Sequence, residues 1–213
     1  MRIYCFLLFL LSSSMVFGQV DYEAIKKRTS DEENEMYYPH LIQRFIDSDS
    51  TLTIEDFQSI YYGVFFHKPY DLDKIIESER TIRLANYSGE YLEAYELADN
   101  LLKEYPVSIQ AYFEKAYACY NLKRFEEEAY NTKRYKILIT TILSSGDGKT
   151  FETAYHANLS NDKYEVIKFL HLEYKEESEV ELDGKVFDVF SLKSNKQKQK
   201  ILYFSKGQQQ AAD

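Results

Sequence analysis

The chain has 213 residues, of which 45% are hydrophobic and 29% are charged, a composition typical of one large or two small globular domains. Its 35 acidic residues outnumber its 26 basic residues, which gives a formal net charge of −9. Such a surface repels phosphate backbones, so we expect no nucleic-acid partner. The core must be rich in Tyr and Phe rings, because the chain has 20 Tyr, 14 Phe and no Trp.

Residues 1–18 have the layout of a secretory signal peptide. One positive charge, Arg2, precedes an apolar stretch from Ile3 to Leu11, and Gly18 stands at the expected cleavage point. This stretch is shorter than the roughly 20 apolar residues of a membrane span. We therefore expect an exported protein without a membrane span, periplasmic or extracellular after cleavage. Cleavage leaves Cys119 as the one cysteine, so we expect a core without an internal disulfide.

Residues 19–145 are predicted to be helical. Asp21–Arg28 forms a short amphipathic start, and Pro39 begins a second helix that runs to Phe45, since proline is tolerated in a first turn. Thr53 begins a third helix, with Asp56 three residues later as a variant of the capping box.

From residue 75 to residue 142 the sequence repeats itself with a period of 34. The segments 91–94 and 125–128 align, and each follows a turn. This pattern resembles the tetratricopeptide repeat, whose helix pairs recur at that period. The residues that carry the resemblance are Gly89, Tyr91, Ala94 and Pro106 in the first unit, then Tyr112, Ala116, Leu122 and Phe125 in the second. Since three units are usually needed for stability, we expect the earlier helices to stack as a degenerate repeat. The alternative is a set of unrelated packed helices.

Residues 146–206 are predicted to form a small antiparallel β-sheet, which makes the fold class α+β: a tetratricopeptide-like helical stack followed by this sheet. The predicted strands are Ala154–Leu159, Tyr164–Tyr174, Val180–Leu182, Val186–Leu192 and Ile201–Phe204. Asp183-Gly184, between two of them, is a strong signal for a two-residue hairpin turn. The tail, residues 207–213, is predicted to be disordered.

Nearly the whole chain after residue 18 is similar to an exported Bacteroides family, the domain of unknown function 4919. The matching segments are 20–26, 37–39, 50–53, 61–63, 146–149, 152–154 and 202–204. The chain departs from the family pattern at Phe151, where a proline is expected, and at Ser205, where an asparagine is expected. The resemblance implies a cell-envelope protein of a gut-type bacterium and carries no activity with it.

Two segments suggest ligand sites but lack required residues. Gly148-Lys149-Thr150 invites a phosphate-loop interpretation, yet Leu143 stands where that motif needs its first glycine. Residues 47–58 suggest a calcium loop, yet Leu52 and Gln58 replace the glycine and the bidentate glutamate that such a loop needs. Both segments are better explained as turns.

No arrangement of residues predicts catalysis, a cofactor or a metal. The four histidines, His40, His67, His156 and His171, show no ligand spacing, and no serine stands in a nucleophile elbow. Cys119 lies among apolar residues of a repeat helix and is expected to be buried.

The best functional candidate is the concave face that the first helices of such repeats present to peptides or proteins. The repeat register places ten residues on it: Ile76, Glu79, Arg83, Asn86, Tyr87, Gln110, Phe113, Tyr117, Tyr120 and Asn121. Those with binding chemistry are Arg83 for carboxylates, Asn86 and Asn121 for peptide backbone, and Tyr87, Tyr117 and Tyr120 for amphipathic contact. Alternatively, the sheet or the N-terminal helices cover this face, and the tyrosines are core.

We therefore expect an exported, non-catalytic protein-interaction or scaffold module of the cell envelope, whose partner is a protein or peptide. Two alternatives stay open. A hydrolase would use carboxylates held across a cleft between the helical and sheet parts. A small-ligand or glycan binder would use the tyrosines in a closed aromatic pocket.

Overall fold

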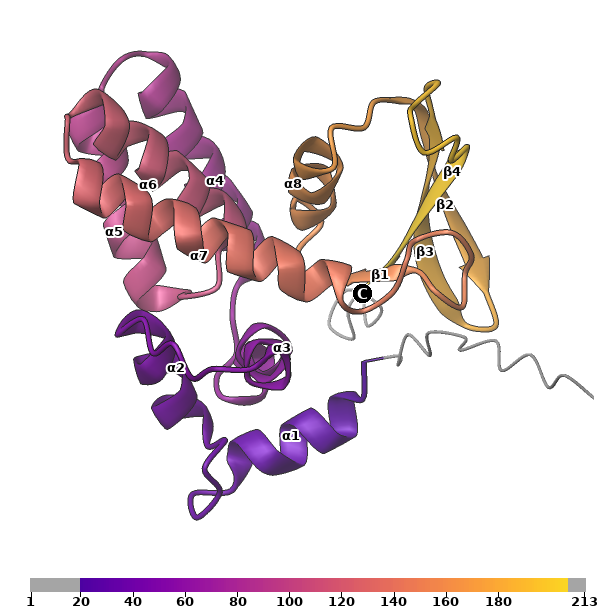
Figure 1. Ribbon diagram of the computed structural model, residues 1–213, viewed down its shortest axis with the longest axis horizontal. Coiled ribbons are helices and arrows are strands. Elements are labelled where there is room, and N and C mark those ends of the chain that lie inside the picture. The colour runs from indigo at the N-terminus through magenta and orange to yellow at the C-terminus, as the bar shows by residue number, and fades with distance from the viewer. Residues whose placement is uncertain (1–19, 207–213) are drawn as a thin grey trace, which may run out of the picture.

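The computed structural model describes residues 20–206, so the predicted signal peptide and the predicted disordered tail lie outside the described residues. A helical N-terminal part is followed by a four-stranded sheet, which confirms the predicted α+β class (Figure 1). The helices are α1 (Tyr22–Ser30), α2 (Tyr38–Ile46), α3 (Ile54–Gly63), the 3₁₀ turn η1 (Val64–Phe66), α4 (Leu72–Tyr87), α5 (Tyr91–Glu104), α6 (Ile109–Asn121), α7 (Phe125–Leu143) and α8 (Asp162–Phe169). The strands are β1 (Tyr155–Ala157), β2 (Tyr174–Leu182), β3 (Lys185–Leu192) and β4 (Ile201–Lys206).

The three predicted N-terminal helices are confirmed as α1, α2 and α3. Pro39 lies in the first turn of α2. Thr53 caps α3 through a reciprocal capping box, in which the Thr53 amide donates to Asp56 Oδ2 at 2.7 Å and the Asp56 amide donates to Thr53 Oγ1 at 3.3 Å. The local signals of the sequence therefore decide where these helices begin.

Helices α4 to α7 form two successive antiparallel pairs that end in the same kind of turn. Gly89 and Lys123, 34 positions apart, both have positive φ, of 80° and 62°. The amide that follows each donates to the carbonyl oxygen five residues back, from Glu90 to Ala85 and from Arg124 to Cys119, at 2.9 Å in both turns. The two predicted units therefore share a turn geometry at the predicted period.

One predicted strand is wrong, because helix α8 occupies most of its residues. Residues 164–174 were expected to be extended, but 162–169 are helical and β2 begins only at Tyr174. The spacing of Val166, Ile167 and Leu170 gives one apolar stripe at helical period, which α8 buries between the sheet and the helical part. β-branched residues fit a strand by propensity, yet tertiary packing overrides that preference here.

The sheet is mixed rather than fully antiparallel. Its strand order is β1-β4-β3-β2, and β1 pairs parallel with β4 while the other neighbours are antiparallel. The predicted hairpin turn is confirmed, since Asp183 and Gly184 have φ of 52° and 72° between the paired residues Leu182 and Lys185. Strand β2 begins six residues before the predicted start at Val180. Residues 174–179 are mostly charged and lie at the edge of the sheet, where charged side chains are tolerated.

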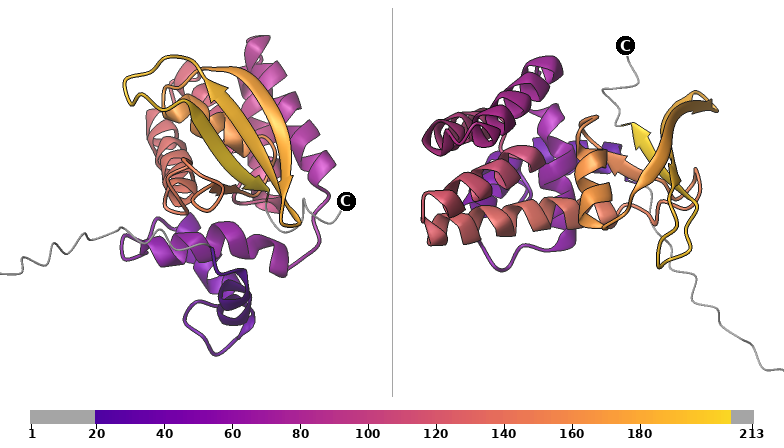
Figure 2. Two further views of the ribbon diagram at one scale, coloured as in Figure 1. Left: turned by 90° about the vertical axis from the view of Figure 1, so that its right-hand side faces the viewer. Right: turned by 90° about the horizontal axis from the view of Figure 1, so that it is seen from above.

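Helix α8 lies between the sheet and helices α6 and α7, as the two further views show (Figure 2). An ion-pair triad fixes it to the sheet: Lys163 Nζ lies 2.8 Å from Asp188 Oδ2 and 2.6 Å from Glu177 Oε1. Lys163 and Asp188 are both buried, so each charge depends on its partner. This arrangement places the C-terminal end of α8 beside α6 and α7.

Candidate functional site

The predicted concave face is partly covered. Glu79, Asn86 and Gln110 are buried. The loop that leads into α8 contributes to this cover, since Asn161 Nδ2 donates to Glu79 Oε2 at 3.2 Å. Asn86 Nδ2 donates to Glu114 Oε2 at 2.8 Å and to the Glu114 carbonyl oxygen at 2.9 Å. The Asn86 amide is thus engaged inside the fold.

The other seven predicted groove residues are exposed or partly exposed. Arg83 is exposed, and Tyr87 is 92% exposed. Asn121 Nδ2 donates to the Tyr117 carbonyl oxygen at 2.9 Å, within its own helix. Tyr117 and Tyr120 are 46% and 61% exposed. The structure brings these two tyrosines together on one surface.

That surface is a groove of about 530 Å³ between α6, α7 and the end of α8, which we call the aromatic groove. It is lined by Phe113, Ala116, Tyr117 and Tyr120 of α6, by Glu128, Thr132, Tyr135 and Lys136 of α7, and by Lys168, Phe169 and His171 from the end of α8 and just beyond it. A cavity of this size with apolar walls and few polar groups has the form of a binding site.

The floor of the aromatic groove is held in place by ring contacts. The rings of Phe113 and Tyr135 have centroids 5.4 Å apart, and those of Tyr135 and Phe169 have centroids 6.2 Å apart. Lys168 Nζ lies 3.4 Å from the centroid of the Phe113 ring, a cation–π contact that joins α8 to α6. Interlocked rings from three helices give a preformed rather than a pliable surface.

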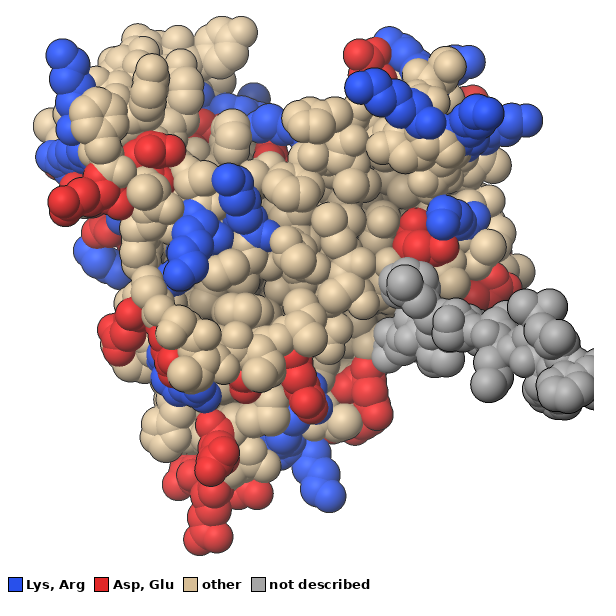
Figure 3. All heavy atoms as spheres, in the orientation of Figure 1, with Lys and Arg blue, Asp and Glu red and all other residues tan. Residues whose placement is uncertain are grey.

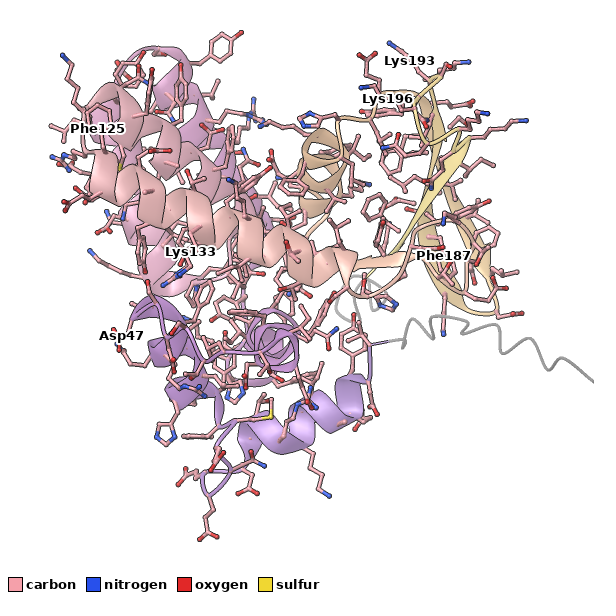
Figure 4. All side chains as sticks on the ribbon, viewed as in Figure 1. Asp47, Phe125, Lys133, Phe187, Lys193 and Lys196 are labelled. Atoms are coloured by element: carbon pink, nitrogen blue, oxygen red, sulfur yellow. The ribbon has the colours of Figure 1, made fainter. Side chains whose placement is uncertain are left out.

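The rim carries mainly positive charge. Within residues 20–206, Lys136 has no hydrogen bond or ion pair with another side chain, whereas Glu128 accepts a hydrogen bond from Thr132 Oγ1 at 3.0 Å. Lysines lie over α7 beside a largely uncharged surface (Figure 3), and Lys133 projects from the same helix (Figure 4). Lys136 is thus the rim lysine without an acidic partner, since Lys168 Nζ lies 3.5 Å from Glu165 Oε2.

A second depression, of about 650 Å³, lies on the other side of α7. It shares Glu128, Thr132 and Lys136 with the aromatic groove and adds Ile54 and Phe57 of α3. The exposed ridge of α7 is thus flanked by a hollow on each side.

Two buried carboxylates lie between the helical part and α8, where a hydrolase was one alternative. Asp162 Oδ2 accepts from the Tyr61 hydroxyl at 2.5 Å and from the Leu159 amide at 3.1 Å. Burial raises the pKa of Asp162 well above its usual range, and the nearby Glu79 adds to the rise. Burial thus favours the protonated form of this carboxyl, against the hydrogen bonds from Tyr61 and Leu159.

Glu79 belongs to the same cluster. Burial raises the pKa of Glu79 to about 7, against the lowering effect of hydrogen bonds from Ser108 Oγ, at 2.7 Å, and from Asn161. Glu79 and Asp162 are 0% and 2% exposed, and neither lines the hollows beside α7. A catalytic carboxyl of a hydrolase must reach its substrate. These two buried carboxyls are therefore better explained as part of the hydrogen-bonded core.

The suspected ligand loops are turns in the structure. Asp49 accepts from Arg44 Nε at 2.7 Å and from Thr51 Oγ1 at 2.7 Å, and these bonds, chiefly from Thr51, lower the pKa of Asp49 to about 2. Asp147 accepts from Thr153 Oγ1 at 2.6 Å and closes the turn that leads from α7 into β1. Cys119 is buried, as predicted. Within the described residues, no group of His, Cys, Asp and Glu is placed to hold a metal.

Sequence reasoning missed the α8 side of the aromatic groove. Lys168, Phe169 and His171 were assigned to a strand, so their meeting with Tyr117 and Tyr120 was not expected. The signal that could have found them is the apolar spacing of residues 166, 167 and 170 after Asp162, an acidic residue suited to a first helical turn.

Comparison with known proteins gives one match. The family model described as domain of unknown function (DUF4919) matches residues 23–211. Neither the curated proteins nor the solved structures contain a match to this chain. Among residues 20–206, no helix has both the length and the apolar character needed to cross a membrane.

Proposed function

The chain belongs to the DUF4919 family of domains of unknown function. Because this family carries no known activity, we propose a role from the geometry of the chain itself. The protein is a non-catalytic interaction module that binds a polypeptide segment in the aromatic groove. The observation that carries this proposal is the exposure of Tyr117 and Tyr120 over a floor of interlocked rings. Tyrosines supply large contact areas with few rotatable bonds, which is why they dominate binding surfaces.

The repeat character supports the same proposal. The turns at Gly89 and Lys123 have matching hydrogen bonds and a separation of 34 positions, as in the tetratricopeptide-like pattern that we infer. In such repeats the first helix of each pair faces the ligand. The groove tyrosines lie on α6, the first helix of the second pair, and α8 stands where a third unit would continue the groove.

We also propose that the protein acts in the cell envelope after export, as part of a Bacteroides-like family. The support is the arrangement of residues 1–18, with one basic residue, an apolar stretch and a small residue before Gln19. Beyond that segment the sequence has one cysteine, the buried Cys119, and so needs no disulfide to fold in an oxidising compartment.

The shape of the groove favours a polypeptide over the two alternatives. A small ligand or glycan held by the tyrosines would need a closed pocket, whereas Tyr117 and Tyr120 remain about half exposed. A hydrolase would need accessible carboxylates, whereas Glu79 and Asp162 are sealed in the core. A long ligand that lies across the surface fits both observations.

Site-specific photo-crosslinking tests the proposal. A photoreactive phenylalanine analogue is introduced at Tyr120 in the native host, and irradiated cells are analysed for adducts by mass spectrometry. We expect a defined polypeptide adduct at this position, because Tyr120 is 61% exposed in the groove.

Leu92 of α5 is the matched control position, since its side chain is 52% exposed and lines neither hollow beside α7. The proposal requires the Tyr120 adduct to be absent when the analogue is at Leu92. Equal adducts at both positions, or none at Tyr120, would contradict it.

A further inference from the structure

The aromatic groove does not end at α8. A neighbouring hollow of about 740 Å³ shares Lys168 and His171 with it and continues along α8 to the beginning of β2. Its lining adds the rings of Tyr164 and Tyr174 and the side chain of Lys193. The two hollows form one track that starts at the C-terminal end of α6 and reaches the sheet, and we call it the extended groove.

The extended groove is lined by more basic than acidic residues, unlike the chain as a whole. Over the whole sequence 35 acidic residues face 26 basic ones, yet the lining contains Lys136, Lys168 and Lys193, together with His171. Two of these lysines have acidic partners: Lys168 Nζ lies 3.5 Å from Glu165 Oε2, and Lys193 pairs with Glu173. Lys136 has no such partner within the described residues, although Glu128, which accepts a hydrogen bond from the neutral Thr132 hydroxyl, lines the same hollow.

The positive charge increases where the extended groove meets the sheet. The loop between β3 and β4 carries Lys193, Lys196, Lys198 and Lys200, and basic side chains gather at this corner of the molecule (Figures 3 and 4). The pair between Lys193 and Glu173 is 2.8 Å long, but the two side chains are 53% and 73% exposed. Such a surface pair contributes little to stability, so Lys193 is able to exchange this partner for a ligand carboxylate.

Resting on the function proposed above, we propose that the ligand is an acidic polypeptide segment in which Asp or Glu residues alternate with aromatic or aliphatic ones. Its apolar side chains pack on Tyr117, Tyr120 and Phe169, and its carboxylates meet Lys136 at one end and Lys193 at the other. Charge complementarity supplies the preference for acidic segments and the ring floor supplies most of the contact area.

The test uses a phage-displayed library of random twelve-residue peptides, selected on the purified protein. The enriched peptides are sequenced, and the tightest one is titrated against the wild type, Lys136→Glu, Tyr120→Ala and the control Lys27→Glu. Lys27 lies exposed on α1, away from the extended groove. Thermal unfolding of each variant verifies that it is folded.

We expect enrichment of Asp and Glu over Lys and Arg among the selected peptides. Lys136→Glu should weaken the tightest peptide roughly tenfold at low salt, because attraction becomes repulsion at a partly screened distance. Lys27→Glu should leave the affinity of this peptide within about twofold of the wild type. Lys27 does not line the extended groove, and solvent and salt weaken the interaction between its charge and the bound peptide.

The other outcomes separate the two proposals. Neutral or basic peptides that are lost with Tyr120→Ala would overturn the acidic preference and leave the groove function standing. Selected peptides that bind equally to Tyr120→Ala, or a library without any binder, would overturn both.

Discussion

Replacing Glu79 by glutamine should stabilise the protein at neutral and alkaline pH and leave its stability unchanged in mild acid. Glu79 is fully buried, and burial raises its pKa from 4.5 to about 7. The unfolded chain loses this proton near pH 4.5, while the folded protein keeps it until about pH 7. The folded state therefore binds more protons in this window, and its stability falls as the pH rises from about 4.5 to about 7.

The magnitude follows from the rise in the pKa of Glu79. One pKa unit corresponds to about 1.36 kcal/mol, so the rise from 4.5 to about 7 corresponds to about 3 kcal/mol lost by pH 8. Glutamine is neutral at every pH. Like the protonated carboxyl of Glu79, it offers one carbonyl oxygen, which accepts the hydrogen bond from Ser108 Oγ, and its NH2 group takes the place of the oxygen that faces Asn161 Nδ2. The variant therefore avoids the loss.

Urea denaturation of the wild type and Glu79→Gln at pH 4.5 and pH 8 measures the effect. We expect similar free energies of unfolding at pH 4.5, and an advantage of about 3 kcal/mol for the variant at pH 8. Glu77→Gln, at an exposed position of the same helix, is the control and should show no such advantage. A variant that is less stable than the wild type at pH 8, or equally shifted at both pH values, would refute the reasoning.

Three further substitutions test the packing that positions the groove, each by chemical or thermal unfolding. Lys163→Met should destabilise the protein by about 3 kcal/mol or more, because it leaves Asp188 charged and buried without its partner; no loss would contradict the assigned triad. Gly146→Ala should lower the melting temperature, because its Cβ would lie 2.3 Å from the Thr153 carbonyl oxygen. Thr53→Ala should cost about 1 kcal/mol through loss of the α3 cap, and a neutral result would show that this cap is dispensable.

Much of the fold follows from local signals in the sequence. The capping box at Thr53, the hairpin turn at Asp183-Gly184 and the period of 34 each specify their structure through a few neighbouring residues. Caps and turns can be predicted because they meet local requirements of the backbone, its hydrogen bonds and its φ angles, through neighbouring residues.

Helix α8 and strand β2 show where local signals fail. Val166 and Ile167 favour a strand by propensity, but the space between the sheet and the helical stack accepts a helix there. Strand β2 is rich in glutamate because it lies at the sheet edge, and its ion pairs to Lys163 and Lys206 come from segments distant in sequence. The partners of β2 appear only in the folded chain, whereas the helical spacing of residues 166, 167 and 170 is present in the sequence.

For the candidate site, the sequence predicts the direction of some side chains but not their partners. The repeat register places Tyr117 and Tyr120 on the groove side of α6, and both line the hollow between α6, α7 and the end of α8. The register also places Asn86 on that side, but Asn86 is buried and its Nδ2 donates to Glu114 Oε2. A helical period gives the direction of a side chain, whereas its partners depend on the neighbouring helices.

The most direct test of the central claim follows the tyrosine rings themselves. Carbon–proton NMR spectra of the ring signals are recorded with and without the tightest library peptide, and Tyr→Phe variants assign the signals. The account predicts that the Tyr117 and Tyr120 signals shift while that of Tyr87, 92% exposed outside the groove, stays in place. Unmoved Tyr117 and Tyr120 signals in the presence of a saturating, tightly bound peptide would contradict it.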